Sequence, residues 1–267
     1  MDLATIFGIG VGLALVIISV LLAEGAKGFL PFLNYEAFFI VMGGTFCALL
    51  VNYPIREVMK LAKVTKKVLT TTEQDDTTEI ITTFVELSKK ARTEGFLSLE
   101  NNLKTMKNDF LKRGVQMVVD GLDKEFIANM METELGLIRE RHKVGQEIFT
   151  ALGTYSPAFG IIGTVLGMIM MLNSISDVQE VPRRMALALA AAFYGLGSGY
   201  LIFLPMSGKL RRKSDDELLV KEIIIRGVLL LQSGAVPSRI EDNLKAYLEP
   251  AQRALIKGAA TTPGNRA

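Results

Sequence analysis

The residues whose types and spacing could do chemistry lie in an apolar stretch from Ile148 to Leu172. Small, kink-forming and mildly polar residues recur there at helical spacing and share one face: Gly153, Pro157, Gly160, Thr164, Gly167 and Met171. Such a face suits close helix packing or a lined pathway. Pro157 also leaves the carbonyl of Gly153 without its helical donor, and protein or water must satisfy it.

A second apolar stretch, from Met185 to Pro205, presents a matching face. Its small residues recur at helical spacing, and three hydroxyls lie among them: Ala188, Ala192, Gly195 and Gly199, with Tyr194, Ser198 and Tyr200. Neither stretch contains an acidic or basic side chain, although moving a cation across a dry membrane core normally needs one. If an ion passes here, another chain must supply the carboxylate. The alternative is that the small residues only pack helices.

Four apolar windows position these faces, and they predict an all-α membrane protein with four transmembrane helices and a helical cytoplasmic domain. Besides the two stretches above, the windows are Thr5 to Ala23 and Glu36 to Val51. Of the 267 residues, 49% are hydrophobic, and the mean hydropathy is +0.33. Each of the first two stretches is long enough to cross a bilayer at about 1.5 Å per residue.

The distribution of Lys and Arg predicts a multi-pass inner-membrane protein with both termini in the cytoplasm. Basic residues are dense in 54–143 and in Lys209 to Lys213, whereas Arg183 and Arg184 run against the trend. The predicted segments are transmembrane helices 1 and 2 at 1–53, a cytoplasmic domain at 54–146, transmembrane helices 3 and 4 at 147–206, a cytoplasmic helical segment at 207–250, and a disordered tail at 251–267.

The hydrophilic blocks read as helices throughout. Residues Glu79 to Arg92 form an amphipathic pattern that Gly95 ends. A further helix is predicted to begin after 96–98 with Ser98 as its N-cap, and others are predicted at 110–121 and 126–143. Residues 209–231 continue the fourth span, and the run IIIRGVLLL is expected to pack on the cytoplasmic helices. Ser238 and Glu241 form a capping-box pattern. The basic stretch at 56–68 is expected to contact anionic membrane lipid.

The sequence does not support nucleic-acid binding, a fixed metal site or catalysis. The net charge of +2 does not favour nucleic acid binding. One histidine, His142, and one cysteine, Cys47, make no metal-ligand set within the chain, so no fixed metal is expected. No nucleophile has the partners that catalysis needs. We therefore expect no enzyme activity and no cofactor.

The motifs and their order resemble the A subunit of the flagellar stator, the MotA/PomA family. The motifs are ARTEGFLSLE at 91–100, TYSPAFGIIGTVLG at 154–167 and AAFYGLGSGYLIFLPMSGKL at 191–210. The opening MDLAT, the segment from VDGLDKEFI through ERH, and the long loop after the second span agree as well. The likeness extends to about Leu248.

This resemblance implies an energy-converting ion channel. In the family, five A subunits surround a dimer of B subunits (MotB/PomB-like), whose single transmembrane helix carries the essential aspartate. Ion flow through that aspartate turns the rotor through the cytoplasmic domain. The implied ion-path residues are Pro157, Thr164, Ala191, Ala192, Tyr200 and Pro205. The implied contacts with the rotor protein FliG are Arg92 and Glu100, with Lys89 and Lys90 as auxiliaries.

The resemblance implies that the transported ion is Na⁺ or H⁺. Thr164 matches the hydroxyl typical of sodium-type members, which favours a transient Na⁺ site there. Ala191 and Ala192, however, stand where sodium-type members have two threonines. Two other readings stay open: an ExbB/TolQ-like energiser of an outer-membrane process, and a structural membrane scaffold. The ExbB/TolQ class has three spans, so four spans favour the stator.

Overall fold

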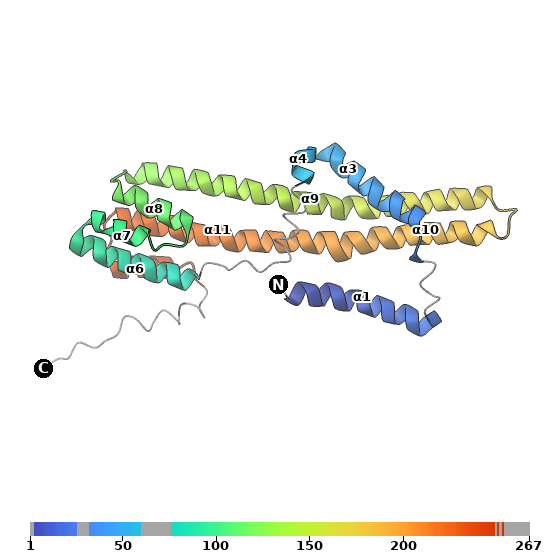
Figure 1. Ribbon diagram of the computed structural model, residues 1–267, viewed down its shortest axis with the longest axis horizontal. Helices are drawn as coiled ribbons and strands as arrows, with labels where there is room; N and C mark the ends of the chain where they lie inside the picture. Colours follow the sequence, from blue (N-terminus) through green and yellow to red (C-terminus); the bar gives the residue numbers. More distant parts are fainter. Residues whose placement is uncertain (1–2, 26–31, 60–75, 249, 251–252, 254–267) are drawn as a thin grey trace. The chain divides into compact units, whose positions relative to one another are not determined.

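The computed structural model describes residues 3–25, 32–59, 76–248, 250 and 253, which form helices and connecting turns (Figure 1). The α-helices are α1 (Leu3–Glu24), α2 (Tyr35–Phe38), α3 (Gly44–Asn52), α4 (Ile55–Val58), α6 (Thr77–Glu94), α7 (Glu100–Leu103), α8 (Asp109–Val119), α9 (Lys124–Asn173), α10 (Glu180–Leu196), α11 (Leu204–Gln232) and α12 (Pro237–Lys245). Two π-helices, η2 (Phe39–Gly43) and η4 (Gly197–Phe203), and the 3₁₀-helix η3 (Phe96–Leu99) complete the list.

Three helices in the described ranges are long and apolar enough to cross a membrane: Tyr35–Asn52, Lys124–Asn173 and Glu180–Gln232. They contain the second, third and fourth predicted spans, and the all-α prediction is confirmed. The first predicted span falls in α1, whose apolar part, Gly10–Ala23, is shorter. The count of four spans therefore stays a prediction.

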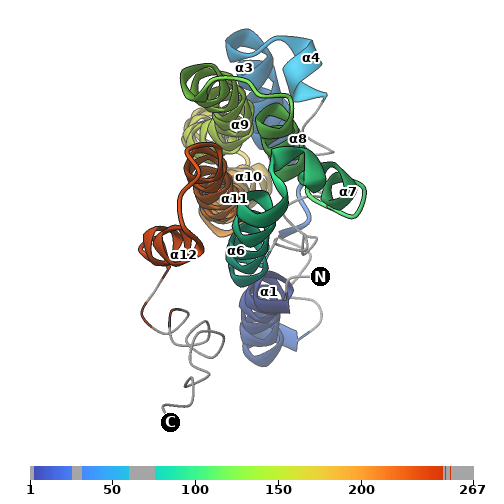
Figure 2. The same ribbon diagram turned by 90° about the vertical axis from the view of Figure 1, so that its left-hand side faces the viewer.

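The chain divides into two compact units, of which the first comprises 1–72 and 141–213 and the second 73–140 and 214–267. The second unit has a core of aliphatic and aromatic side chains from α6, α8, α9, α11 and α12; Figure 2 shows these helices end-on. Phe84 of α6 and Ile223, Ile224 and Val228 of α11 are fully buried there. The predictions of an amphipathic helix near 79–92 and of packing by the IIIRGVLLL run are thus confirmed.

Two predicted helix starts in this unit are wrong. Ser98 does not cap a helix; it lies within η3, and its hydroxyl donates to the carbonyl of Gly95. Gly95 does end α6, with φ at +82°, a conformation that glycine adopts without strain. At α12, Val236 is the N-cap and Pro237 takes the first helical position, which its fixed φ favours. Ser238 therefore lies inside the first turn and makes no capping box.

Three sequence predictions fall partly or wholly outside the described residues. They are the bend before α2 at 26–31, the lipid-contacting stretch beyond residue 59, and the tail from 251, of which residue 253 alone is described.

Candidate ion path beside the α9–α10 interface

Helices α9 and α10 approach so closely that glycine is required where they meet (Figure 1). A Cβ atom on Gly195 would lie 2.7 Å from the carbonyl oxygen of Ser156 and 2.8 Å from the Cα of Gly160. A Cβ on Gly167 would lie 2.8 Å from the backbone nitrogen of Ala188. We call this contact the glycine interface: Gly160, Gly163 and Gly167 of α9 with Ala188, Ala191 and Gly195 of α10. The predicted small-residue face thus packs two helices of the same chain.

The backbone around Pro157 is accommodated by another glycine. A Cβ on Gly199 would lie 2.8 Å from the proline ring and 2.9 Å from the carbonyl oxygen of Gly153. Gly153 is the residue whose carbonyl loses its helical donor to Pro157. Gly199 belongs to η4, a seven-residue π-helix. Irregular backbone in both helices therefore meets at one level of the interface, and π-segments of this kind are frequent at functional sites.

Hydroxyl groups join α9 at three levels to the helical run formed by α10, η4 and α11. At one end of the interface the Thr164 hydroxyl donates to the carbonyl of Ala188 at 3.2 Å. The hydroxyls of Ser156 and Ser198 hydrogen-bond to each other near Pro157. Further along, Thr150 and Ser207 hydroxyls lie 2.8 Å apart, and that of Ser207 also donates to the carbonyl of Gln146. Each bond gives these hydroxyl groups a hydrogen-bond partner. Without one, burying a hydroxyl in an apolar environment would cost free energy.

Thr164 is half-buried, and its single proton is shared between two carbonyls, those of Gly160 at 2.9 Å and Ala188 at 3.2 Å. A hydroxyl that donates to backbone keeps its lone pairs for another donor or a cation. The neighbouring carbonyl oxygens are also hard-cation ligands. The group as a whole carries no negative charge. Thr164 can therefore contribute a neutral oxygen to a passing cation but cannot neutralise one.

The other predicted path residues occupy different environments. Ala191 is fully buried against Gly163, and Ala192 and Pro157 are half-buried at the edge of the interface. Tyr200 is 58% exposed, and Pro205 is exposed too. The structure thus brings Thr164, Pro157, Ala191 and Ala192 to the α9–α10 contact. It leaves Tyr200 and Pro205 on an open surface of the first unit.

Tyr194, whose hydroxyl the sequence placed among the polar groups of the fourth span, holds the segment before α2. Its hydroxyl donates to the carbonyl of Phe32 and accepts from the backbone N–H of Asn34. Asn34 in turn caps α2 through a bond from the N–H of Ala37 to its side-chain oxygen, 3.0 Å long. The ring of Tyr194 also packs edge-on against Phe38. This tyrosine therefore attaches the start of the Tyr35–Asn52 helix to α10.

Four charged side chains form a cluster that the sequence did not predict. Glu180 and Arg184 of α10 lie 3.2 Å apart, and Arg184 also lies 3.9 Å from Glu36 of α2. Arg183 approaches Glu36 at 3.7 Å and Glu180 at 3.5 Å. Two cations and two anions neutralise one another here. Arg183 and Arg184, which lie outside the segments where basic residues are dense, are therefore each paired with a carboxylate. The sequence feature that could have predicted this is the presence of Glu36 and Glu180 at the ends of the two helices.

The titration of Tyr53, just beyond the Tyr35–Asn52 helix, is perturbed. Partial burial raises the pKa of its hydroxyl above the usual value, and the nearby Glu147, Tyr155 and Glu57 raise it further. No cluster of three or more His, Cys, Asp or Glu side chains in the described part of the chain could hold a metal ion.

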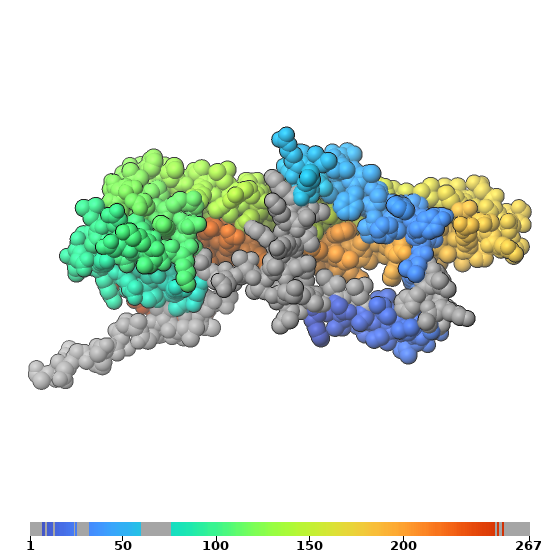
Figure 3. Space-filling model, viewed as in Figure 1, coloured from blue at the N-terminus to red at the C-terminus, as the bar shows by residue number. Residues whose placement is uncertain are grey.

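The four residues predicted to contact the rotor lie together in the second unit. Lys89, Lys90 and Arg92 belong to α6, and Glu100 begins α7, after the turn through Gly95. Arg92, Lys89 and Glu100 are exposed, whereas the ammonium of Lys90 donates to Asn102 at 2.8 Å. Figure 3 shows the outer surface that α6, α7 and α8 form in this unit. These charges are accessible to a protein partner.

The features described so far define a class: all-helical membrane proteins whose long apolar helices pack through glycine and hydroxyl residues. A model of the MotA/TolQ/ExbB proton channel family matches residues 102–223. Motility protein A of Borreliella burgdorferi is 36% identical over 259 residues, 97% of this chain and 98% of that protein. Chemotaxis protein PomA of Vibrio alginolyticus is 33% identical over 255 residues, 96% of this chain and 98% of that protein.

A solved structure agrees with these relatives. The flagellar MotAB stator complex from Bacillus subtilis contains a chain with a TM-score of 0.83 and 35% identity, covering 94% of this chain and 98% of that one. The chain therefore belongs to the MotA/PomA family, the ion-conducting subunits of the flagellar stator. The resemblance drawn from the sequence motifs is confirmed.

Proposed function

We propose that this chain, with a B-type partner, conducts cations down their gradient across the inner membrane and converts the flow into torque on the flagellar rotor. The observation that carries the proposal is an irregular interface in an apolar region that offers neutral oxygens and no carboxylate. A chain built in this way needs another protein to supply the ionisable group. The solved relative is a complex of MotA with MotB, which supports such a partner.

The proposed assembly is a ring of five copies of this chain around two partner helices, with four spans per copy and both termini in the cytoplasm. Exposed apolar side chains on α9 and α10 support contacts with lipid or other chains: Ile161, Val165, Ile169, Leu189, Phe193 and Leu196 are all more than 40% exposed. In this arrangement α1 is the remaining span.

We assign the ion path to the open edge of the glycine interface. Thr164, Ala192 and Pro157 are half-buried there, and Tyr200 presents an exposed ring and hydroxyl. Thr164 favours Na⁺ over H⁺ because a hydroxyl and two carbonyls suit a hard cation. The alanines at 191 and 192 add no further ligand, so the site holds Na⁺ only in passing.

The experiment that tests the ion measures swimming speed against sodium concentration in the native cell. Thr164→Ala removes the hydroxyl and should abolish or severely weaken sodium-dependent swimming. Thr164→Ser keeps the hydroxyl and is the matched control, which should retain most of the response. Motility of Thr164→Ala that is unchanged across sodium concentrations would eliminate the sodium site.

The rotor contact is tested separately from ion conduction. Arg92→Glu should abolish rotation while leaving ion leak through the assembled stator unchanged, because Arg92 lies on α6 in the second unit. The matched control is Lys112→Glu, which makes the same charge change at an exposed position of α8. Normal swimming by Arg92→Glu would remove this residue from the rotor contact. We expect FliG, through its own charged residues, to be the partner.

A further inference from the structure

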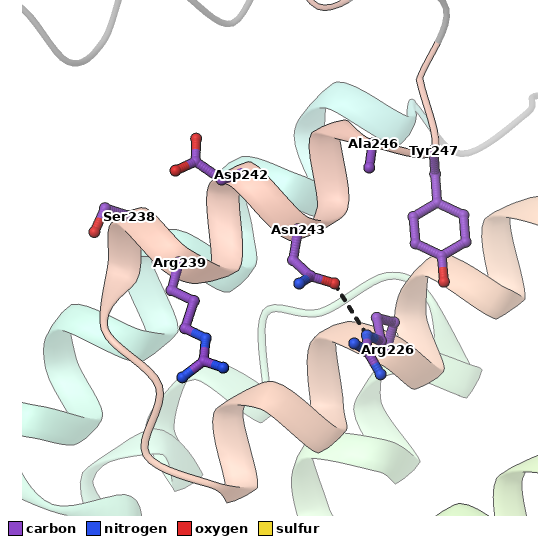
Figure 4. Close-up of a pocket in the computed structure, with 7 residues that line it drawn as sticks. All are labelled: Arg226, Ser238, Arg239, Asp242, Asn243, Ala246 and Tyr247. Carbon is purple, nitrogen blue, oxygen red and sulfur yellow. Dashed lines mark hydrogen bonds between the residues drawn. The ribbon is translucent and has the colours of Figure 1, made fainter.

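A groove between α11 and α12 in the second unit carries two arginines without acidic partners. The groove has a volume of about 660 Å³ and is lined by Arg226, Ser238, Arg239, Asp242, Asn243, Ala246 and Tyr247. Figure 4 shows the side chains of Arg239, on α12, and of Tyr247, in the turn after α12, projecting toward α11, where Arg226 lies. Asp242 also lines the groove, although its carboxylate points away from α11 in the same view.

Two of the acidic residues near these arginines are paired with other cations. Glu222, one turn before Arg226 on α11, pairs with Arg139 at 3.1 Å. Glu241 on α12 pairs with Lys245. Among the described residues, Arg226 bonds only to the neutral amide oxygen of Asn243, at 3.0 Å, and Arg239 has no hydrogen-bond or ion-pair partner. The groove lining therefore sets two guanidinium groups against the single carboxylate of Asp242, which forms an ion pair with neither of them.

We propose that this groove binds a phosphoryl group. A phosphate carries close to two negative charges and several strong acceptor oxygens, which match two guanidinium forks better than a single carboxylate does. The hydroxyls of Ser238 and Tyr247, both exposed on the groove, supply further donors. The volume falls within the range of small-molecule sites, about 300–1,000 Å³. The ligand is a phosphorylated small molecule or the headgroup of an anionic phospholipid.

Binding is tested with inorganic pyrophosphate as the probe and the full chain in phosphatidylcholine nanodiscs, by calorimetric titration at low ionic strength. We expect saturable binding that Arg239→Gln and Arg226→Gln each weaken about tenfold, as loss of one charge-assisted contact in a solvated groove would do. Lys112→Gln removes the same charge elsewhere in this unit and should change the affinity less than twofold. Circular dichroism of each variant checks that the fold is kept.

The outcomes separate the ligand classes. No saturable binding, or equal weakening by Lys112→Gln, would overturn the site, and succinate binding as tightly as pyrophosphate would overturn the phosphoryl assignment. Nanodiscs containing phosphatidylglycerol identify the source: competition with pyrophosphate points to lipid headgroups, and its absence points to a soluble ligand. These measurements do not depend on motility, so their result is independent of the proposed stator function.

Discussion

Replacing Gly195 with alanine should separate the two helices at the heart of the glycine interface. The new methyl carbon would start 2.7 Å from the carbonyl oxygen of Ser156 and 2.8 Å from the Cα of Gly160. Both obstacles are backbone atoms, so no side-chain rotation relieves the clash, and α9 and α10 must move apart. A Cβ on Gly197, two residues along, would have no heavy atom within 4 Å apart from the chain next to it in its own helix. The same substitution there changes helix propensity without changing packing.

The magnitude follows from two opposing terms. Overpacking costs about 1–3 kcal/mol, and a clash with the backbone of α9 belongs in the upper half of that range, because backbone cannot rotate aside. Alanine in place of helical glycine returns about 1 kcal/mol. We therefore expect Gly195→Ala to lose about 1–2 kcal/mol net and Gly197→Ala to gain up to about 1 kcal/mol. The two variants therefore differ by about 1–3 kcal/mol, which for a chain of this size corresponds to roughly 2–12 °C in melting temperature.

The assay is thermal unfolding of each purified variant in the same detergent, followed by circular dichroism. Swimming of cells carrying each variant supplies a second readout, because α10 also bears the proposed ion path. If Gly195→Ala melts at or above the temperature of Gly197→Ala, close backbone approach is not what glycine provides at this position. The interface would then have to be held by its hydroxyl bonds alone.

Three further changes probe other contacts. Ser88, 1% exposed, donates from α6 to the backbone before α12, so Ser88→Ala should lose about 1–2 kcal/mol of unfolding free energy while Thr82→Ala, at an exposed position, changes little. Arg184→Gln should lower the melting temperature more than Arg183→Gln, because the Arg184 side chain is 27% exposed against 61%, and high salt should narrow the difference. Because the pKa of Tyr53 is raised in the folded protein, the free energy of unfolding should fall as pH rises above about 10, and it should fall less steeply in Tyr53→Phe. Near pH 8 the slope of the unfolding free energy against pH should be the same in both proteins.

Local periodicity predicted much of this fold because it reports burial within one element. The apolar face of α6, the glycine that ends it and the long apolar runs are all properties of neighbouring residues. The small-residue face of α9 was equally visible. The sequence could not show what this face does, because helix packing and an ion path require the same residue types. Only the distances from Gly160 and Gly167 to α10 decide that this face packs within the chain.

The contacts that sequence reasoning missed join residues far apart in the chain. Tyr194 bonds to Phe32 and Asn34 across about 160 positions, and no periodicity within one helix marks such a pair. The start of α12 was missed for a different reason: Ser238 and Glu241 have capping spacing, but Pro237 before them already sets the first helical turn. The π-segment η4 has no sequence rule, although Gly197 and Gly199 permit its widened backbone.

Packing within the chain also constrains how the proposed channel can work. Ala191 is fully enclosed by the glycine interface, so its side chain offers no surface to a cation. Thr164, half-buried, and Tyr200, exposed, keep open surface on the same helices. A carboxylate from a partner helix would therefore have to approach the edge of the interface, where the Thr164 hydroxyl lies beside two backbone carbonyls. Under this arrangement the alanine at 191 matters for helix spacing, and a threonine there would act first by pushing against Gly163 before it could act as a ligand.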